Sequence, residues 1–220
     1  MRITRIASDR SHRGSKSIYA DGEYLTSISA EMLIRSGLRV GDDISEDTLQ
    51  AIQHSETVLS AKTTALRFLS YRPRTEREVR DKLREKEFPE NEITAAIADL
   101  KKSGLLNDAE FARMYIQNVL AARPVGKTVL RQKMLLLGLD RTTAEAALEG
   151  TFKDLNQEEV AMEAAVKFVS RVRNMRTTVD RRKLRGRVTS FLARRGFPWD
   201  VVNTVVRRLL TADQLKEDSE

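Results

Sequence analysis

An internal repeat constrains this chain more than any other feature of its sequence. A pattern of five apolar residues recurs after a shift of 51 residues and again after a further 58, with the same internal spacing each time. The fifteen positions are Val79, Leu83, Phe88, Ile93 and Ile97; Leu130, Met134, Leu139, Ala144 and Leu148; and Val188, Leu192, Phe197, Val202 and Val206. The sequence therefore predicts three copies of one structural unit.

The spacing within each copy is that of two amphipathic helices joined by a tight corner. Gly138 and Gly196 coincide in this register, and glycine favours the left-handed residue that ends many helices. Pro89 and Pro198 coincide too, at the start of the next helix, where a missing N–H costs little. Glu87 replaces glycine in the first copy, which predicts a left-handed non-glycine residue or a different turn there. Residues 58–71, 108–122 and 157–173 supply a first helix for each copy, and residues 174–179 form a longer link in the third.

The first sixty residues follow another pattern. Residues 2–7 and 17–20 are strand candidates, and Asp21-Gly22 indicates a two-residue hairpin turn. A helix ended by Gly37 and another beginning at Ser45 follow. The predicted organisation is a β-hairpin segment with short helices at 1–57, repeats at 58–107, 108–156 and 157–212, and a polar tail at 213–220. The fold class is mainly α, with three tandem three-helix repeats of helix-turn-helix type.

Composition excludes several classes of function. The chain has no cysteine, which removes disulfides, thiolate metal sites and thiol catalysis. It has no apolar run of membrane-spanning length, and its start lacks a signal peptide, so we expect a cytoplasmic protein without membrane contact. His12 and His54 lack the spacing of a metal site, and Gly126-Lys127-Thr128 lacks the earlier glycine of a phosphate loop. We therefore expect no enzymatic activity, metal or cofactor.

The positive charge is concentrated near the C-terminus. The chain carries a net charge of +7, and residues 171–208 hold twelve basic side chains against Asp180 and Asp200. Such an excess is typical of a surface that binds a polyanion, although a solvated helical face is the alternative. Lys183, Arg187 and Arg194 are predicted to point outward on the helix whose buried stripe contains Leu184, Val188, Phe191 and Leu192. The candidate binding residues are Arg72, Arg74, Arg171, Arg173, Arg176, Arg181, Arg182, Lys183, Arg185, Arg187, Arg194 and Arg195.

The candidate surface favours phosphate contact over base recognition. Its residues are almost all arginine and lysine, whereas base-edge readout also draws on asparagine and glutamine. Single-strand binding often uses exposed aromatic rings. Phe191, Phe197 and Trp199 have the spacing of core residues, which leaves Tyr71 as the better exposed candidate.

The same residues resemble the RecX family, regulators of the bacterial RecA recombinase. The likeness is carried by residues 65–69 (ALRFL) with 72–79 (RPRTEREV), by 105–108 (LLND) with Phe111, Ala112 and Tyr115, and by 123–126 (RPVG) with Leu130 and 138–139 (GL). It covers residues 58–210. It implies an elongated, curved body and a non-enzymatic modulator of DNA repair and recombination in the SOS response. This modulator would bind RecA and its nucleoprotein filament and inhibit recombinase and ATPase activity.

Two further interpretations stay open at this point. One is a helix-turn-helix regulator that binds duplex DNA, and the other is a helical-repeat scaffold whose basic face binds an acidic protein. No heptad or separate dimerisation helix is evident, so we expect a monomer. In the RecX interpretation, the basic third repeat binds single- or double-stranded DNA.

Overall fold

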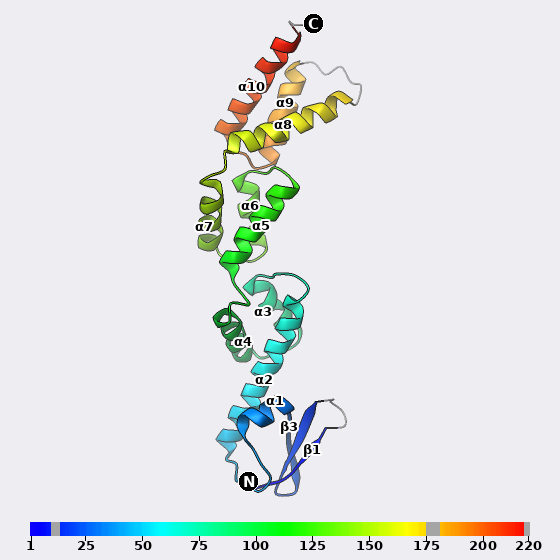
Figure 1. Cartoon of the computed structure of the whole chain (residues 1–220), viewed down its shortest axis with the longest axis vertical. Coiled ribbons are helices and arrows are strands. Elements are labelled where there is room, and N and C mark those ends of the chain that lie inside the picture. The colour runs from blue at the N-terminus through cyan, green and yellow to red at the C-terminus, as the bar shows by residue number, and fades with distance from the viewer. Residues whose placement is uncertain (10–13, 175–180, 218–220) are drawn as a thin grey trace. The chain divides into compact units, whose positions relative to one another are not determined.

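The chain begins with three short strands and continues in helices. A computed structural model describes residues 1–9, 14–174 and 181–217. Within these ranges the order of elements is β1 (Ile3–Ser8), β2 (Ser15–Ala20), β3 (Glu23–Ser29), α1 (Ala30–Ser36), α2 (Glu46–Leu69), α3 (Glu76–Glu85), α4 (Glu90–Lys102), α5 (Asp108–Ala122), α6 (Lys127–Leu136), α7 (Arg141–Phe152), α8 (Gln157–Asn174), α9 (Arg181–Arg194) and α10 (Trp199–Glu217) (Figure 1). The mainly helical fold class with an N-terminal β segment is confirmed.

The elements form two units. The first comprises Met1–Arg74 and Glu78–Leu106, and the second comprises Thr75–Arg77 and Asn107–Glu220. The first unit therefore contains the sheet and most of repeat 1, whereas the second contains repeats 2 and 3 together with the residues at the start of α3.

The sheet is an antiparallel meander with the strand order β1-β2-β3. Asp21 and Gly22 join β2 to β3, and both have positive φ, 51° and 92°. Positive φ at both central positions is the requirement of a type I′ turn, so the hairpin prediction is confirmed. The side chains of Ile3, Ile18 and Ile28 are each about 1% exposed and form the core of this part of the chain.

One helix connects the sheet to the first repeat. Ser45 caps α2 by accepting a hydrogen bond from the amide of Thr48, as predicted. The helix then continues to Leu69, across the expected boundary at residues 57 and 58, because no glycine or proline interrupts it. Leu49 and Ile52 pack into the core below the sheet, while Ala61 and Ala65 pack into the core of repeat 1. A single helix thus serves two cores.

Each repeat is a three-helix bundle around its own core. The first and third helices pack together in every copy, as α2 with α4, α5 with α7 and α8 with α10. Fourteen of the fifteen predicted core positions are buried. The fifteenth, Phe88, is partly buried and packs against the core of repeat 1. The repeat register is therefore confirmed, although α10 extends to Glu217 and so includes residues expected in the polar tail. Of the predicted link at 174–179, Asn174 is the last residue of α8 and the rest lies outside the described residues.

The corner after the second helix has one hydrogen-bonding pattern in all three repeats. The amides of Phe88, Leu139 and Phe197 donate to the carbonyls of Leu83, Met134 and Leu192 at 3.1–3.3 Å. The preceding residues, Glu87, Gly138 and Gly196, are left-handed, with φ of 60°, 92° and 81°. These are the bonds and dihedral angles of a Schellman motif. Glu87 therefore forms the same corner without glycine, which is the first of the two predicted possibilities.

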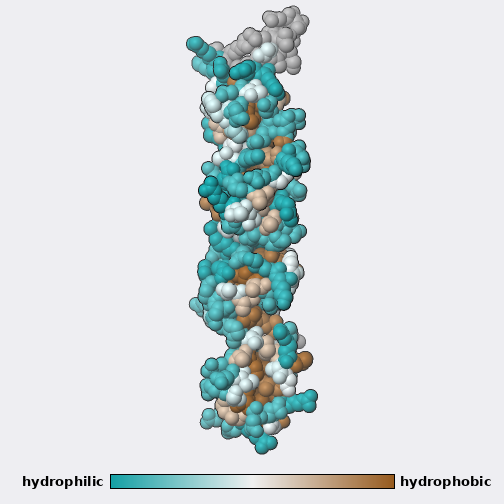
Figure 2. All heavy atoms as spheres, turned by 90° about the vertical axis from the view of Figure 1, so that its left-hand side faces the viewer, coloured by the Kyte–Doolittle hydropathy of each residue, from teal (hydrophilic) through white to brown (hydrophobic). Residues whose placement is uncertain are grey.

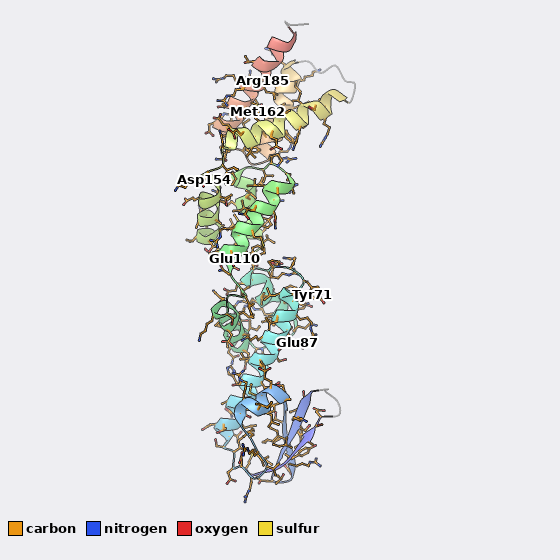
Figure 3. All side chains as sticks on the ribbon, viewed as in Figure 1. Tyr71, Glu87, Glu110, Asp154, Met162 and Arg185 are labelled. Carbon is orange, nitrogen blue, oxygen red and sulfur yellow. The ribbon has the colours of Figure 1, made fainter. Side chains whose placement is uncertain are left out.

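Packing explains why two corners need glycine and one does not. In the second unit, a Cβ on Gly196 would lie 2.6 Å from the amide nitrogen of Val129, and one on Gly138 would clash with Arg77. Glu87, labelled in Figure 3, is exposed, so its Cβ meets solvent. Glycine is thus required at the corners on which another helix start packs.

Replacing Leu192 with alanine should lower the free energy of unfolding by about 2–5 kcal/mol, because this fully buried side chain would leave a cavity. Leu136→Ala is the matched control, since Leu136 lies on the equivalent helix of repeat 2 and is 76% exposed. Its cost should stay below about 0.5 kcal/mol. Urea unfolding followed by circular dichroism measures both, and equal costs would contradict the repeat register.

Gly196→Ala should lower the free energy of unfolding by about 2–4 kcal/mol, because it adds backbone strain and a clash with Val129. Glu87→Ala places the same residue at the exposed corner of repeat 1 and should change stability by less than about 0.5 kcal/mol. The same urea titration compares them. A Gly196→Ala cost no larger than that of Glu87→Ala would show that the close contact is not what requires glycine.

Candidate polyanion-binding surface

Charge, rather than apolar area, distinguishes the surface of this protein. The face shown in Figure 2 is mainly hydrophilic, with hydrophobic residues in separate patches. The exposed large apolar side chains, such as Ile34, Leu136 and Trp199, lie on different elements. The distribution of charge is therefore the feature that marks a candidate binding surface.

The second helix of the third repeat, α9, presents a basic face to solvent. Lys183, Arg187 and Arg194 are exposed, as predicted, and so are Arg182 and Arg185, the latter labelled in Figure 3. Leu184, Val188 and Leu192 are buried on the opposite side. Because the apolar stripe of α9 is buried in the core of repeat 3, the basic side chains on its opposite side face the solvent.

The charge of the second helix increases from one repeat to the next. Helix α3 has four acidic and four basic residues, α6 has three basic residues and no acid, and α9 has six basic residues and no acid. One equivalent position of the repeat register shows the same change in charge, because it is Glu78 in α3, Val129 in α6 and Arg187 in α9. Helix α3 thus carries acids that offset its basic residues, whereas α9 carries none.

A groove runs between α8 and α9 on the basic side. It has a volume of about 600 Å³ and is lined by Phe168, Lys183, Gly186, Arg187, Ser190 and Arg194. Gly186 has open space where a Cβ would stand. The rings of Phe168 and Phe191 stack at 4.3 Å beside it. The groove therefore combines three cations with an apolar wall.

A second hollow of about 330 Å³ lies where repeat 3 meets repeat 2. Its lining includes Arg123, Val129, Arg194 and Arg195, so Arg194 lines both hollows. Arg195 is held in place because its guanidinium donates to the carbonyl of Pro124 at 2.8 Å and lies 4.9 Å from the ring of Phe191. Partial burial, and then the positive charges of Arg123 and Arg171, lower the pKa of the Arg195 guanidinium below its usual value. Like charges thus gather here without a neutralising acid.

Arg123 is a member of this surface that the candidate residues omitted. It is exposed and lines the second hollow beside Arg194 and Arg195. The signal for it was present in the sequence, because the 51-residue shift aligns Arg123-Pro124 with Arg72-Pro73. A basic residue at this equivalent position marks the start of the second helix in both repeats.

The two candidates of repeat 1 have a different environment. Arg72 and Arg74 both pair with the carboxylate of Glu78. Arg74 also stacks over the ring of Phe68, 4.1 Å from its centroid, and is largely buried. Both arginines are therefore engaged by an acid within repeat 1, unlike Lys183, Arg187 and Arg194 on α9, a helix that carries no acid.

The remaining candidates divide by what the structure describes. Arg171 is exposed near the end of α8 and contributes its charge to the Arg195 cluster. Arg176 lies outside the described residues, and the side chains of Arg173 and Arg181 are also outside them. The structure thus places Arg171, Arg182, Lys183, Arg185, Arg187, Arg194 and Arg195 on repeat 3.

The aromatic residues follow the sequence expectations with one exception. Phe197 is buried, as predicted, and Tyr71, the candidate for an exposed ring, is 79% exposed. Trp199 is 64% exposed, so its assignment to the core was wrong. The reason is its position as the first residue of α10, directly after Pro198, where the helix has no preceding turn to cover it.

Neither a metal site nor a membrane segment emerges from the described part of the chain. There, no cluster of three or more histidine, aspartate or glutamate side chains could hold an ion. None of the helices within it is long and apolar enough to cross a membrane. His54 instead pairs with the buried Glu92 through Nδ1 at 3.0 Å.

Comparisons with known proteins agree with the three-repeat organisation. The models of the first, second and third three-helix domains of RecX match residues 61–100, 107–148 and 157–206. The chain is 30% identical to the regulatory protein RecX of Clostridium beijerinckii over 96% of this chain and 97% of that protein. It is 32% identical to the regulatory protein RecX of Bacillus velezensis over 94% and 76% of the two chains.

Solved structures give the same result. A crystal structure of a regulatory protein RecX superposes with a TM-score of 0.74 at 26% identity, covering 93% of this chain and 98% of that one. RecX from Lactobacillus salivarius superposes with a TM-score of 0.63 at 27% identity, over 70% and 97%. With all three domain models matched in order, the chain belongs to the RecX family of regulatory proteins.

Proposed function

We propose that this protein is a non-enzymatic regulator of the RecA recombinase that binds the RecA–DNA filament and inhibits its ATPase and recombinase activities. Membership of a family whose relatives are named regulatory proteins supports the regulatory role. The name RecX and the resemblance of the repeats support RecA as the partner. In this role the protein acts in the cytoplasm during DNA repair, without a cofactor of its own.

The observation that carries the DNA-binding part is the row of exposed cations on α9 in repeat 3. Lys183, Arg187 and Arg194 face one groove, and no carboxylate lies on α9 to pair with them. Cations held apart from acids gain most from phosphate, because binding releases the counterions condensed on a nucleic acid. A mixed-charge helix such as α3 would gain little by the same contact.

The surface supports backbone contact rather than sequence recognition. The exposed polar side chains that line the α8–α9 groove are Lys183, Arg187, Ser190 and Arg194. These groups bind phosphate oxygens, which are common to every sequence. A protein that follows a filament along arbitrary DNA requires this kind of sequence-independent contact.

Adding this protein to the recombinase should reduce DNA-dependent ATP hydrolysis as its amount approaches that of the filament sites. Steady-state and single-turnover ATPase assays measure the effect, with co-sedimentation of the filament as a second readout. Absence of both inhibition and association at stoichiometric amounts would rule out the proposal. Tight binding to duplex DNA alone, without an effect on the ATPase, would favour a helix-turn-helix regulator, and binding only to acidic protein would favour a scaffold.

Changing Arg182, Lys183 and Arg187 together to glutamate should abolish DNA and filament association while preserving helicity, because all three side chains are exposed. The control changes Lys86, Lys102 and Lys153 to glutamate, which alters the net charge equally at exposed positions elsewhere. Fluorescence anisotropy with labelled DNA gives the affinities, and circular dichroism gives the helicity. Unchanged binding, or an equal loss in the control, would mean that the α9 face is only a solvated surface.

A further inference from the structure

The contact between repeats 2 and 3 contains a group of cations that the α9 face does not include. Arg123 comes from the loop before α6, and Arg195 from the corner after α9. The second hollow places them around Val129, with Arg194 at its edge. None of these three arginines has a carboxylate partner among the described residues. The group is therefore a positively charged site built from two repeats.

Repeat 1 shows what the equivalent position looks like when it is neutralised. Arg72 corresponds to Arg123, and Glu78 corresponds to Val129. In repeat 1 the carboxylate of Glu78 accepts hydrogen bonds from Arg72 and Arg74. In repeat 2 a valine stands at that point, so Arg123 keeps its place in the register but has no carboxylate partner in the part of the chain that the structure describes. An oxyanion supplied from outside would restore the missing partner.

The hollow is held open by backbone contacts rather than by flexible side chains alone. The amide of Gly126 donates to the carbonyl of Arg195 at 2.9 Å, and a Cβ on Gly126 would clash with the Gly196 carbonyl. The guanidinium of Arg195 is fixed by the Pro124 carbonyl. Preorganised arginines bind oxyanions well because less side-chain freedom is lost on binding.

The ligand that fits is a phosphate group of a nucleic-acid strand. Arg194 lines both hollows, so the cations continue from Lys183 and Arg187 across Arg194 to Arg123. A continuous row of cations fits a ligand with repeated negative charges better than a single carboxylate. Guanidinium groups also match phosphate geometry through paired hydrogen bonds.

We propose that Arg123, Arg194 and Arg195 bind a backbone phosphate of a nucleic-acid strand at the contact between repeats 2 and 3, in the place that Glu78 takes in repeat 1. This site extends the α9 surface onto repeat 2 and makes the strand bridge two repeats. It rests on the proposed DNA binding of repeat 3. It adds a residue of repeat 2, Arg123, as a direct phosphate ligand.

The first test places a carboxylate at position 129, because repeat 1 has Glu78 at the equivalent position. In Val129→Glu, the new side chain should neutralise Arg123 as Glu78 neutralises Arg72. Binding to a labelled oligothymidine strand should weaken by roughly tenfold, and the slope of log affinity against log salt should become shallower by about 1. Val129→Gln is the matched control, because it has the same shape and the same packing change beside Gly196, and it should keep the salt slope of the natural protein.

A second pair of variants tests the arginine itself. Arg123→Gln should reduce the salt slope by about 1, whereas Arg113→Gln, an exposed position on α5 of the same repeat, should leave it unchanged. Equal effects of Val129→Glu and Val129→Gln, or of Arg123→Gln and Arg113→Gln, would overturn the site. Competition by polyglutamate as strong as that by the DNA strand would overturn phosphate as its ligand.

These outcomes separate the site from the proposed function. If the α9 charge reversal abolishes binding while Arg123→Gln and Val129→Glu bind normally, the site is wrong and the α9 surface stands. If the natural protein inhibits the recombinase without binding DNA, the site is wrong and recombinase regulation stands. If the natural protein neither inhibits nor associates with the filament, the proposed function fails, whatever the salt slopes show.

Discussion

The left-handed corner after each second helix is the constraint on which the rest of this structure depends. Its backbone turns the chain so that the third helix folds back onto the first, and the same two hydrogen bonds close it in all three repeats. In the second unit the corner is also a contact point, because the start of an earlier second helix packs directly on Gly138 and Gly196. A side chain at either position would separate elements that the core requires to be in contact. One residue therefore determines both the fold of a repeat and its packing on a neighbour.

The clustering of basic side chains follows from that packing. The backbone hydrogen bond from Gly126 to Arg195 brings the loop before α6 next to the corner after α9. Cations from two repeats then lie around one hollow, although 71 residues separate Pro124 from Arg195. Repulsion between Arg123, Arg171 and Arg195 accompanies this arrangement and contributes to the lowered pKa of Arg195. The glycines that allow the repeats to approach thus also concentrate the charge.

Sequence reasoning identified the features that depend on local pattern. The core positions, the type I′ hairpin and the helix caps follow from spacing and residue type, and the structure confirms them. It was less successful where tertiary context decides. The expected boundary at residues 57 and 58 lies inside α2, because a helix without glycine or proline can serve two cores. Trp199 has the spacing of a core residue but is the first residue of α10 and is exposed. The repeat register aligned Arg123 with Arg72, but its position beside Arg195 depends on a contact between residues that are distant in sequence.

The three repeats can be understood as one scaffold with three charge states. The buried stripe is nearly constant, so selection of a stable fold leaves the outer positions free to vary. At the position of Glu78, Val129 and Arg187, the residue is acidic, neutral and basic in turn. The acidic residue is used internally, since Glu78 holds Arg72 and Arg74. Val129 leaves Arg123 without a carboxylate partner among the described residues. Arg187 adds a cation to the groove between α8 and α9. Because the corners and the buried stripe are shared, the charge of each second helix is determined by its outer positions, of which this one is an example.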